Sequence, residues 1–115
     1  MTLKNMTSLT NKYLKQSDVD NLVDPIGVKY LSYVVVNVDW GTTWLTDHPI
    51  DNPSEETFEW LEVLKSVENT DGKFVFVELG AGFGRWALRA YKACLFNNIN
   101  PKNIKLIVAE AEPQH

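Results

Sequence analysis

The sequence contains a single cysteine, no long hydrophobic run and no excess of basic residues, and each shortage bears on the class of protein. One thiol, Cys94, cannot form an intrachain disulfide, which excludes a disulfide-stapled domain and favours a reducing compartment. No apolar stretch approaches the ~20 residues that span a membrane, so we expect no membrane partner. A net charge of −4 supplies no basic patch, so we expect no nucleic-acid partner either.

What is present is an ordinary globular composition. The 115 residues are 44% hydrophobic and 23% charged, enough for one small domain with a modest core. The first residues lack the continuous apolar stretch of a secretory signal, so we expect a cytoplasmic location. His48 stands in a loop without a cluster of further ligands, and the sequence predicts no metal site. Nothing in the composition specifies an oligomeric state.

Residues 1–70 form an N-terminal segment with two predicted elements. The β-branched and aromatic run over 30–40 predicts a strand. A helix is predicted over 53–68, with Asn52 as N-cap, Pro53 at the first helical position and Glu55 completing a capping box. Its apolar residues recur at helical spacing: Phe58, Trp60, Leu61, Val63, Leu64 and Val67.

Residues 71–115 have the pattern of a βαβ unit. The nearly continuous apolar run 73–79 predicts a strand buried on both faces, as in a parallel sheet. A helix over 85–96 and a second strand over 104–109 follow, and a right-handed crossover makes the two strands parallel. The larger apolar residues of the helix are Leu88, Tyr91 and Leu95, with alanines and Cys94 as small packing partners. Because the sequence stops directly after the second strand, we expect the N-terminal part of a longer protein.

The junction between the first strand and the helix is the stretch FVELGAGFGRW, with Gly80, Gly82 and Gly84 at alternate positions. Open α/β sheets bind ligands at this place, although a merely tight turn is the simpler alternative. A dinucleotide fingerprint, G-x-G-x-x-G, would need a third glycine where Arg85 stands. Glu78, two residues before the first glycine, would repel a pyrophosphate and attract a cationic ligand.

Two motifs carry a resemblance to a known family. VELGAGFG resembles the first motif of class I S-adenosylmethionine-dependent methyltransferases, and IKLIVAEAEP resembles the segment whose terminal acid binds the cofactor's ribose hydroxyls. ELGAGFGRW together with AEAEP is similar to the FkbM-like branch. The resemblance implies a Rossmann-like, three-layer αβα fold, here truncated after the second strand. It also implies S-adenosyl-L-methionine as cofactor and O-methylation of a small-molecule or sugar-like acceptor.

The resemblance also implies a cofactor site. Glu78 would interact with the methionine end of the cofactor, and Glu110 with its ribose, with Glu112 as the competing acid. The backbone beneath the cofactor would come from Gly80, Ala81, Gly82 and Gly84. No catalytic base is assigned, and we expect it beyond His115, so the chain alone should not be catalytically competent. Two alternatives remain open: a dinucleotide-binding oxidoreductase fragment, and a non-catalytic Rossmann-like interaction module.

Overall fold

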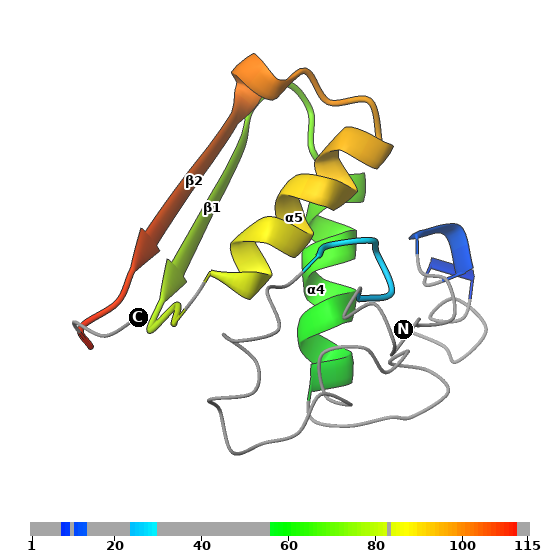
Figure 1. Cartoon of the computed structure of the whole chain (residues 1–115). Helices are drawn as coiled ribbons and strands as arrows, with labels where there is room; N and C mark the ends of the chain where they lie inside the picture. The colour runs from blue at the N-terminus through cyan, green and yellow to red at the C-terminus, as the bar shows by residue number, and fades with distance from the viewer. Residues whose placement is uncertain (1–7, 10, 14–23, 30–55, 83, 113–115) are drawn as a thin grey trace. The chain divides into compact units, whose positions relative to one another are not determined.

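The computed structural model describes residues 8–9, 11–13, 24–29, 56–82 and 84–112 (Figure 1). The chain divides into two compact units, residues 1–62 and 63–115. The main elements are helix α4 (Glu56–Glu68), strand β1 (Phe74–Leu79), helix α5 (Arg85–Phe96), the 3-10 helix η2 (Pro101–Asn103) and strand β2 (Ile104–Ala109). The predicted strand over 30–40 and the predicted capping residues Asn52, Pro53 and Glu55 lie outside the described residues.

In the first unit, residues 8–9 and 11–13 are helical and residues 24–28 form a turn around a buried aspartate. The Asp24 carboxylate accepts hydrogen bonds from the backbone N–H of Ile26 (3.1 Å) and of Val28 (2.8 Å). Gly27 adopts a left-handed φ of 85° at the same turn. These backbone donors offset the cost of burying the carboxylate.

Helix α4 buries most of the apolar stripe that the sequence predicts. Its buried apolar residues are Trp60, Leu61, Val63, Leu64 and Val67. Phe58 was predicted in the same stripe, but this prediction is wrong, because its side chain is 70% exposed. At 100° per residue, position 58 falls on the side of the helix opposite to 60, 64 and 67, so its apolar character does not follow the helical period.

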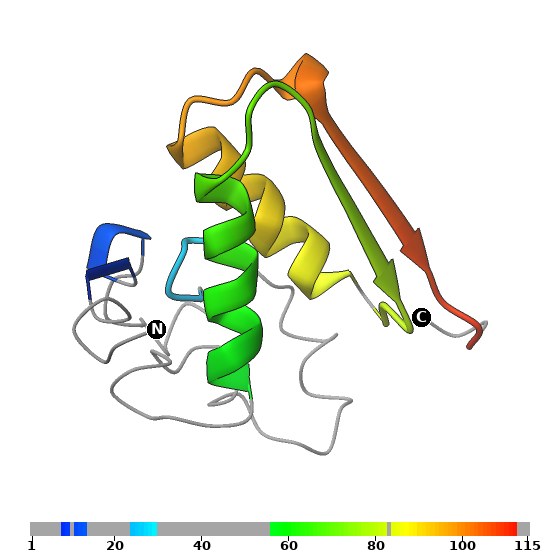
Figure 2. The same cartoon turned by 180° about the vertical axis from the view of Figure 1, so that it is seen from behind.

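The second unit contains a two-stranded parallel sheet, which makes the fold mixed α/β as predicted. β1 pairs with β2 in a register that runs from Phe74 opposite Ile104 to Leu79 opposite Ala109. The two arrows run side by side in the same direction in Figure 1 and in the reverse view of Figure 2. Between α5 and β2 the chain turns through η2, where the Asn100 side chain accepts a hydrogen bond from the N–H of Lys102 (3.0 Å).

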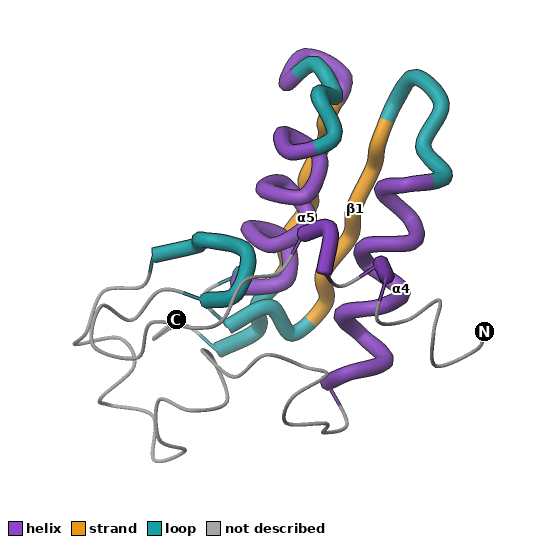
Figure 3. Tube along the Cα trace, turned by 90° about the vertical axis from the view of Figure 1, so that its right-hand side faces the viewer, coloured by secondary structure: helices purple, strands orange, loops and turns teal. Residues whose placement is uncertain are grey.

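One face of this sheet is covered and the other is open. Helix α5 packs on both strands, and Phe74, only 5% exposed, lies on the covered face with the ring of Phe76 stacked 6.3 Å away. The alternate side chains of the strands lie on the opposite face, where exposures range from 41% to 78%: Val75, Val77, Leu79 and Ile107. The prediction that 73–79 is buried on both faces is therefore wrong for this structure. The tube view of Figure 3 shows β1 and α5 as separate layers of the unit.

The core-facing side of α5 is built from small residues. Its buried apolar residues are Ala87, Ala90, Ala93 and Cys94, whereas Leu88 and Leu95 are 41% and 37% exposed. The helix thus buries the face with its small residues, whereas the sequence predicted that the face with the large residues would be buried. Alanine side chains allow the helix axis to lie close to the sheet. None of the described helices combines the length and the apolarity that a membrane crossing requires.

The buried thiol of Cys94 gives a prediction on pH dependence. Burial raises the pKa of this thiol from an ordinary 9.0 to about 11. Above pH 9 the unfolded chain loses this proton while the folded chain keeps it, so the free energy of unfolding falls between about pH 9 and 11. We expect Cys94→Ala to remove this component, which urea unfolding of both proteins at pH 8.0, 9.5 and 10.5 will measure. Parallel pH curves for the two proteins would contradict the assignment.

Candidate functional site

The turn between β1 and α5 has a backbone conformation that requires glycine at three positions. Gly80, Gly82 and Gly84 have φ values of 67°, 54° and 73°, all in the left-handed region. Residues with a Cβ rarely adopt this region, and glycine adopts it at little steric cost. The alternation of glycines in the sequence thus corresponds to an alternation of left-handed positions in the turn.

Backbone hydrogen bonds fix the turn to the carboxyl end of β2. The N–H groups of Gly80 and Ala81 both donate to the carbonyl oxygen of Ala109, at 2.8 and 3.1 Å. The N–H of Gly84 donates to the carbonyl oxygen of Ala81 at 2.7 Å. The turn therefore lies at the edge of the sheet where both parallel strands end, the place at which open α/β sheets bind ligands.

Glu78 has a structural role that the sequence did not reveal. Its Oε2 accepts a hydrogen bond from the N–H of Ala87 at 2.9 Å, in the first turn of α5. The N-cap of this helix is Gly84, which offers no side-chain oxygen. A carboxylate also interacts favourably with the positive end of the helix dipole. Glu78 thus caps α5 from the neighbouring strand β1, near the carboxyl edge of the sheet.

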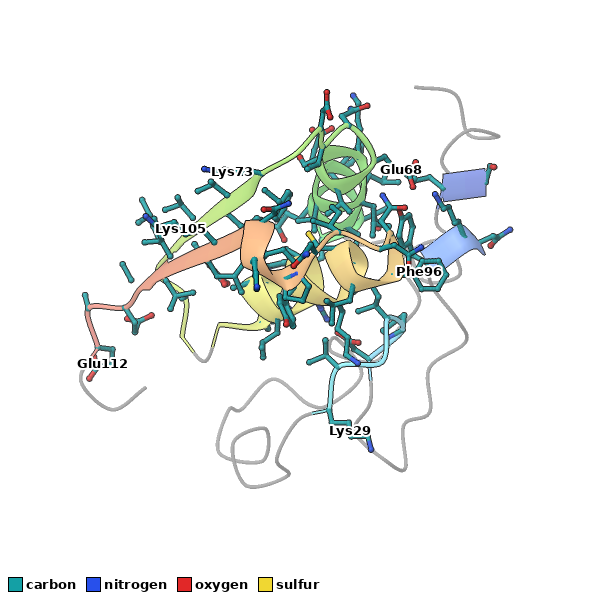
Figure 4. The ribbon with its side chains drawn as sticks, turned by 90° about the horizontal axis from the view of Figure 1, so that it is seen from above. Lys29, Glu68, Lys73, Phe96, Lys105 and Glu112 are labelled. Carbon is teal, nitrogen blue, oxygen red and sulfur yellow. The ribbon has the colours of Figure 1, made fainter. Side chains whose placement is uncertain are left out.

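Glu110 lies directly after β2 and contacts the glycine turn. Its Oε2 accepts a hydrogen bond from the N–H of Gly82 at 2.7 Å, across 28 positions of sequence. Its Oε1 accepts one from the N–H of Glu112, also at 2.7 Å. The acid that meets the turn is therefore Glu110, whereas Glu112 contributes its backbone and lies past the end of β2 (Figure 4).

A cluster of two arginines and one tryptophan occupies the first turns of α5. The guanidinium carbon of Arg85 lies 5.3 Å from the centre of the Trp86 ring, and that of Arg89 lies 4.6 Å from the same ring. Arg89 is fully buried. In the sequence, Arg85 stood out only as the residue that replaces a fingerprint glycine, and Arg89 did not stand out. The sequence could have indicated this cluster, because Arg89 stands four residues after Arg85 and three after Trp86. Side chains at these spacings are neighbours on a helix.

The described residues around the turn include two carboxylates and several backbone N–H groups. Glu110 accepts a hydrogen bond from the turn at Gly82 and Glu78 accepts one from Ala87, and the amides of Gly80, Ala81 and Gly84 donate to backbone carbonyl groups. A Cβ placed on Gly80 would meet nothing within 4 Å, and one on Gly84 would meet only Val108, at 3.9 Å. Within the described part of the chain no three histidine, cysteine or acidic side chains gather as a metal site would require. There is therefore room for an added side chain at Gly80 and Gly84, whereas Ala81 between them is buried, and two carboxylates contact the turn and the start of α5.

Comparison with known proteins adds no family: no protein-family model, curated protein or solved structure matches the chain. The class of protein that the structure defines is a mixed α/β chain with a parallel strand pair and a glycine turn at its carboxyl edge.

Proposed function

We propose that this chain is the cofactor-binding part of an S-adenosyl-L-methionine-dependent methyltransferase with a Rossmann-like fold, acting on an oxygen of a small-molecule or sugar-like acceptor. The observation that carries the proposal is a pair of carboxylates at the carboxyl edge of parallel strands: Glu110 contacts the glycine turn, Glu78 contacts the start of α5, and space is open beside Gly80. With its one cysteine buried as a free thiol, we place the protein in the cytoplasm.

Charge favours this cofactor over a dinucleotide. S-Adenosylmethionine carries a sulfonium and an ammonium, which carboxylates attract, and its ribose hydroxyls are hydrogen-bond donors. A pyrophosphate would instead place two negative charges near the same carboxylates, which is unfavourable where water is partly excluded. The arginine at position 85, where a dinucleotide fingerprint has glycine, counts against the oxidoreductase as well.

The residues in this chain would bind and orient the methyl donor. The open space beside Gly80 allows a ligand to approach the backbone closely. Glu110 would accept hydrogen bonds from the ribose, and Glu78 would attract the charged methionine end. Transfer of a methyl group requires the acceptor oxygen in line with the methyl and sulfur at about 3 Å, so positioning supplies much of the catalysis. The cofactor brings the reactive sulfonium methyl group.

A titration followed by NMR tests the proposal. We expect S-adenosylhomocysteine to shift the amide signals of Gly80, Ala81 and Gly82, and NAD at the same concentration to leave them unchanged. Gly80→Asn fills the open space with a residue that tolerates a left-handed φ, and it should weaken binding about tenfold or more. Gly72→Asn, in another turn with a left-handed φ and open surroundings, is the matched control. Binding of NAD alone would overturn the proposal, and binding of neither ligand would favour the non-catalytic module.

A further inference from the structure

The turn between α4 and β1 contains the pair Asp71-Gly72, the one place in the sequence where a glycine follows an aspartate or an asparagine. The backbone nitrogen after an aspartate can attack the side-chain carboxyl group, and a glycine leaves this nitrogen without a hindering side chain. Both residues are exposed, in the loop that joins the two elements in Figure 1. We infer that Asp71-Gly72 is a site of spontaneous covalent modification, at which the aspartate is converted to isoaspartate.

The hydrogen bonds that hold the end of α4 come from the residue before Asp71. Thr70 donates its N–H to the carbonyl oxygen of Val67 at 3.1 Å and its hydroxyl to that of Ser66 at 2.9 Å. Gly72 has a left-handed φ of 92°, and a Cβ placed on it would meet nothing within 4 Å. The Asp71 side chain is exposed beside this open space, so it can turn towards the Gly72 nitrogen without displacing a packed neighbour.

Asp24, the other aspartate among the described residues, lacks these conditions. Its side chain is buried, and its carboxylate accepts hydrogen bonds from the N–H groups of Ile26 and Val28. Pro25 follows it, and proline has no backbone N–H whose proton could be lost in the reaction. Of the two described aspartates, the fold therefore protects one and exposes the other, which makes the reaction selective for position 71.

The reaction has two steps and needs only water. The Gly72 nitrogen approaches Cγ of the Asp71 carboxylic acid to about 3 Å and attacks it. The N–Cγ bond forms, the bond from Cγ to the hydroxyl oxygen breaks, and the hydroxyl group leaves with the amide proton as water, which gives a cyclic succinimide. Water then adds to the ring. Addition at the backbone carbonyl of Asp71 breaks its bond to the nitrogen and leaves isoaspartate, which adds one methylene to the main chain between α4 and β1, whereas addition at Cγ restores aspartate.

Peptide mapping after incubation of the folded chain at 37 °C tests the inference. Trypsin releases residues 66–73, in which isoaspartate has the mass of aspartate but a different retention time and a different electron-transfer fragmentation pattern. We expect the isomer to accumulate at a rate within about tenfold of that in a synthetic peptide of the same residues, because folding orders little more than the backbone of one residue here. A slower rate in the folded chain, or isomer only at other aspartates, would overturn the inference.

Two variants at position 71 identify the attacked carbon. Asp71→Asn offers ammonia as the leaving group, so the folded chain should convert about tenfold faster or more, with a mass increase that fragmentation locates at this position. Asp71→Glu keeps the charge but would have to form a six-membered ring, and it should yield no detectable isomer. Both exposed substitutions should leave the urea unfolding midpoint unchanged. Equal isomer in Asp71→Glu, or no faster conversion in Asp71→Asn, would show that the Gly72 nitrogen does not attack this side chain.

Discussion

Replacing Glu78 by alanine is expected to lower the free energy of unfolding by about 2 kcal/mol, because the N-terminus of α5 loses its capping carboxylate. The N–H of Ala87 would lose its acceptor in a partly buried place, and the helix dipole would lose a favourable charge. Since the N-cap residue is a glycine, the N-cap position itself has no side-chain oxygen that could replace the missing acceptor. Urea unfolding followed by circular dichroism measures the change.

Two variants separate hydrogen bonding at Glu78 from charge. Glu78→Gln keeps an acceptor oxygen but no charge, so its loss of stability should be about half that of alanine. Glu112→Gln removes an exposed carboxylate whose side chain caps no helix, and its effect should stay within about 0.5 kcal/mol. If Glu78→Ala costs no more than Glu112→Gln, Glu78 does not cap α5.

Replacing Gly84 by valine should cost about 2 kcal/mol of stability, and the cost should come from the backbone. Gly84 has φ 73° and ψ 33°, a conformation that β-branched residues almost never adopt. The space itself is sufficient, because a Cβ there would meet only the Val108 side chain at an ordinary 3.9 Å. Thermal and urea unfolding will give the magnitude.

Asparagine is the matched control at position 84, since it adds a Cβ and a polar group but tolerates a left-handed φ. Gly84→Asn should therefore cost less than 1 kcal/mol. Equal losses for valine and asparagine would show that crowding, and not the φ angle, requires glycine at this position.

The sequence predicted the bounds of the helices and strands better than the burial of their side chains. Helix 85–96 and strand 104–109 have the bounds that were expected, because glycines, asparagines and a proline interrupt the apolar runs on both sides. Burial was harder to predict, because an apolar run shows which side chains could be covered but not whether another element covers them. Val75 and Val77 are exposed for this reason, although their run suggests a doubly buried strand.

The proximity of Glu110 to the glycine turn follows from the topology, whereas the role of these residues as a cofactor site stays a prediction. Parallel strands end at the same edge, so an acid after the second strand was expected near the glycines after the first, and Glu110 does contact Gly82. The capping of α5 by Glu78 was missed because capping rules concern residues adjacent in sequence to the helix start. Glu78 stands nine positions before Ala87, so the contact forms only because β1 and α5 pack together.

The open face of the sheet bears on the solubility of the chain. Its four exposed apolar side chains would promote face-to-face association of copies, which is how β-rich surfaces aggregate. Lys105 lies on this same face, opposite Val75 in the strand register, and Figure 4 shows it on the outer side of the strands. Two copies stacked there would have to desolvate an ammonium group from each partner, at a cost that opposes aggregation. Lys105 thus opposes face-to-face stacking of two copies through this surface.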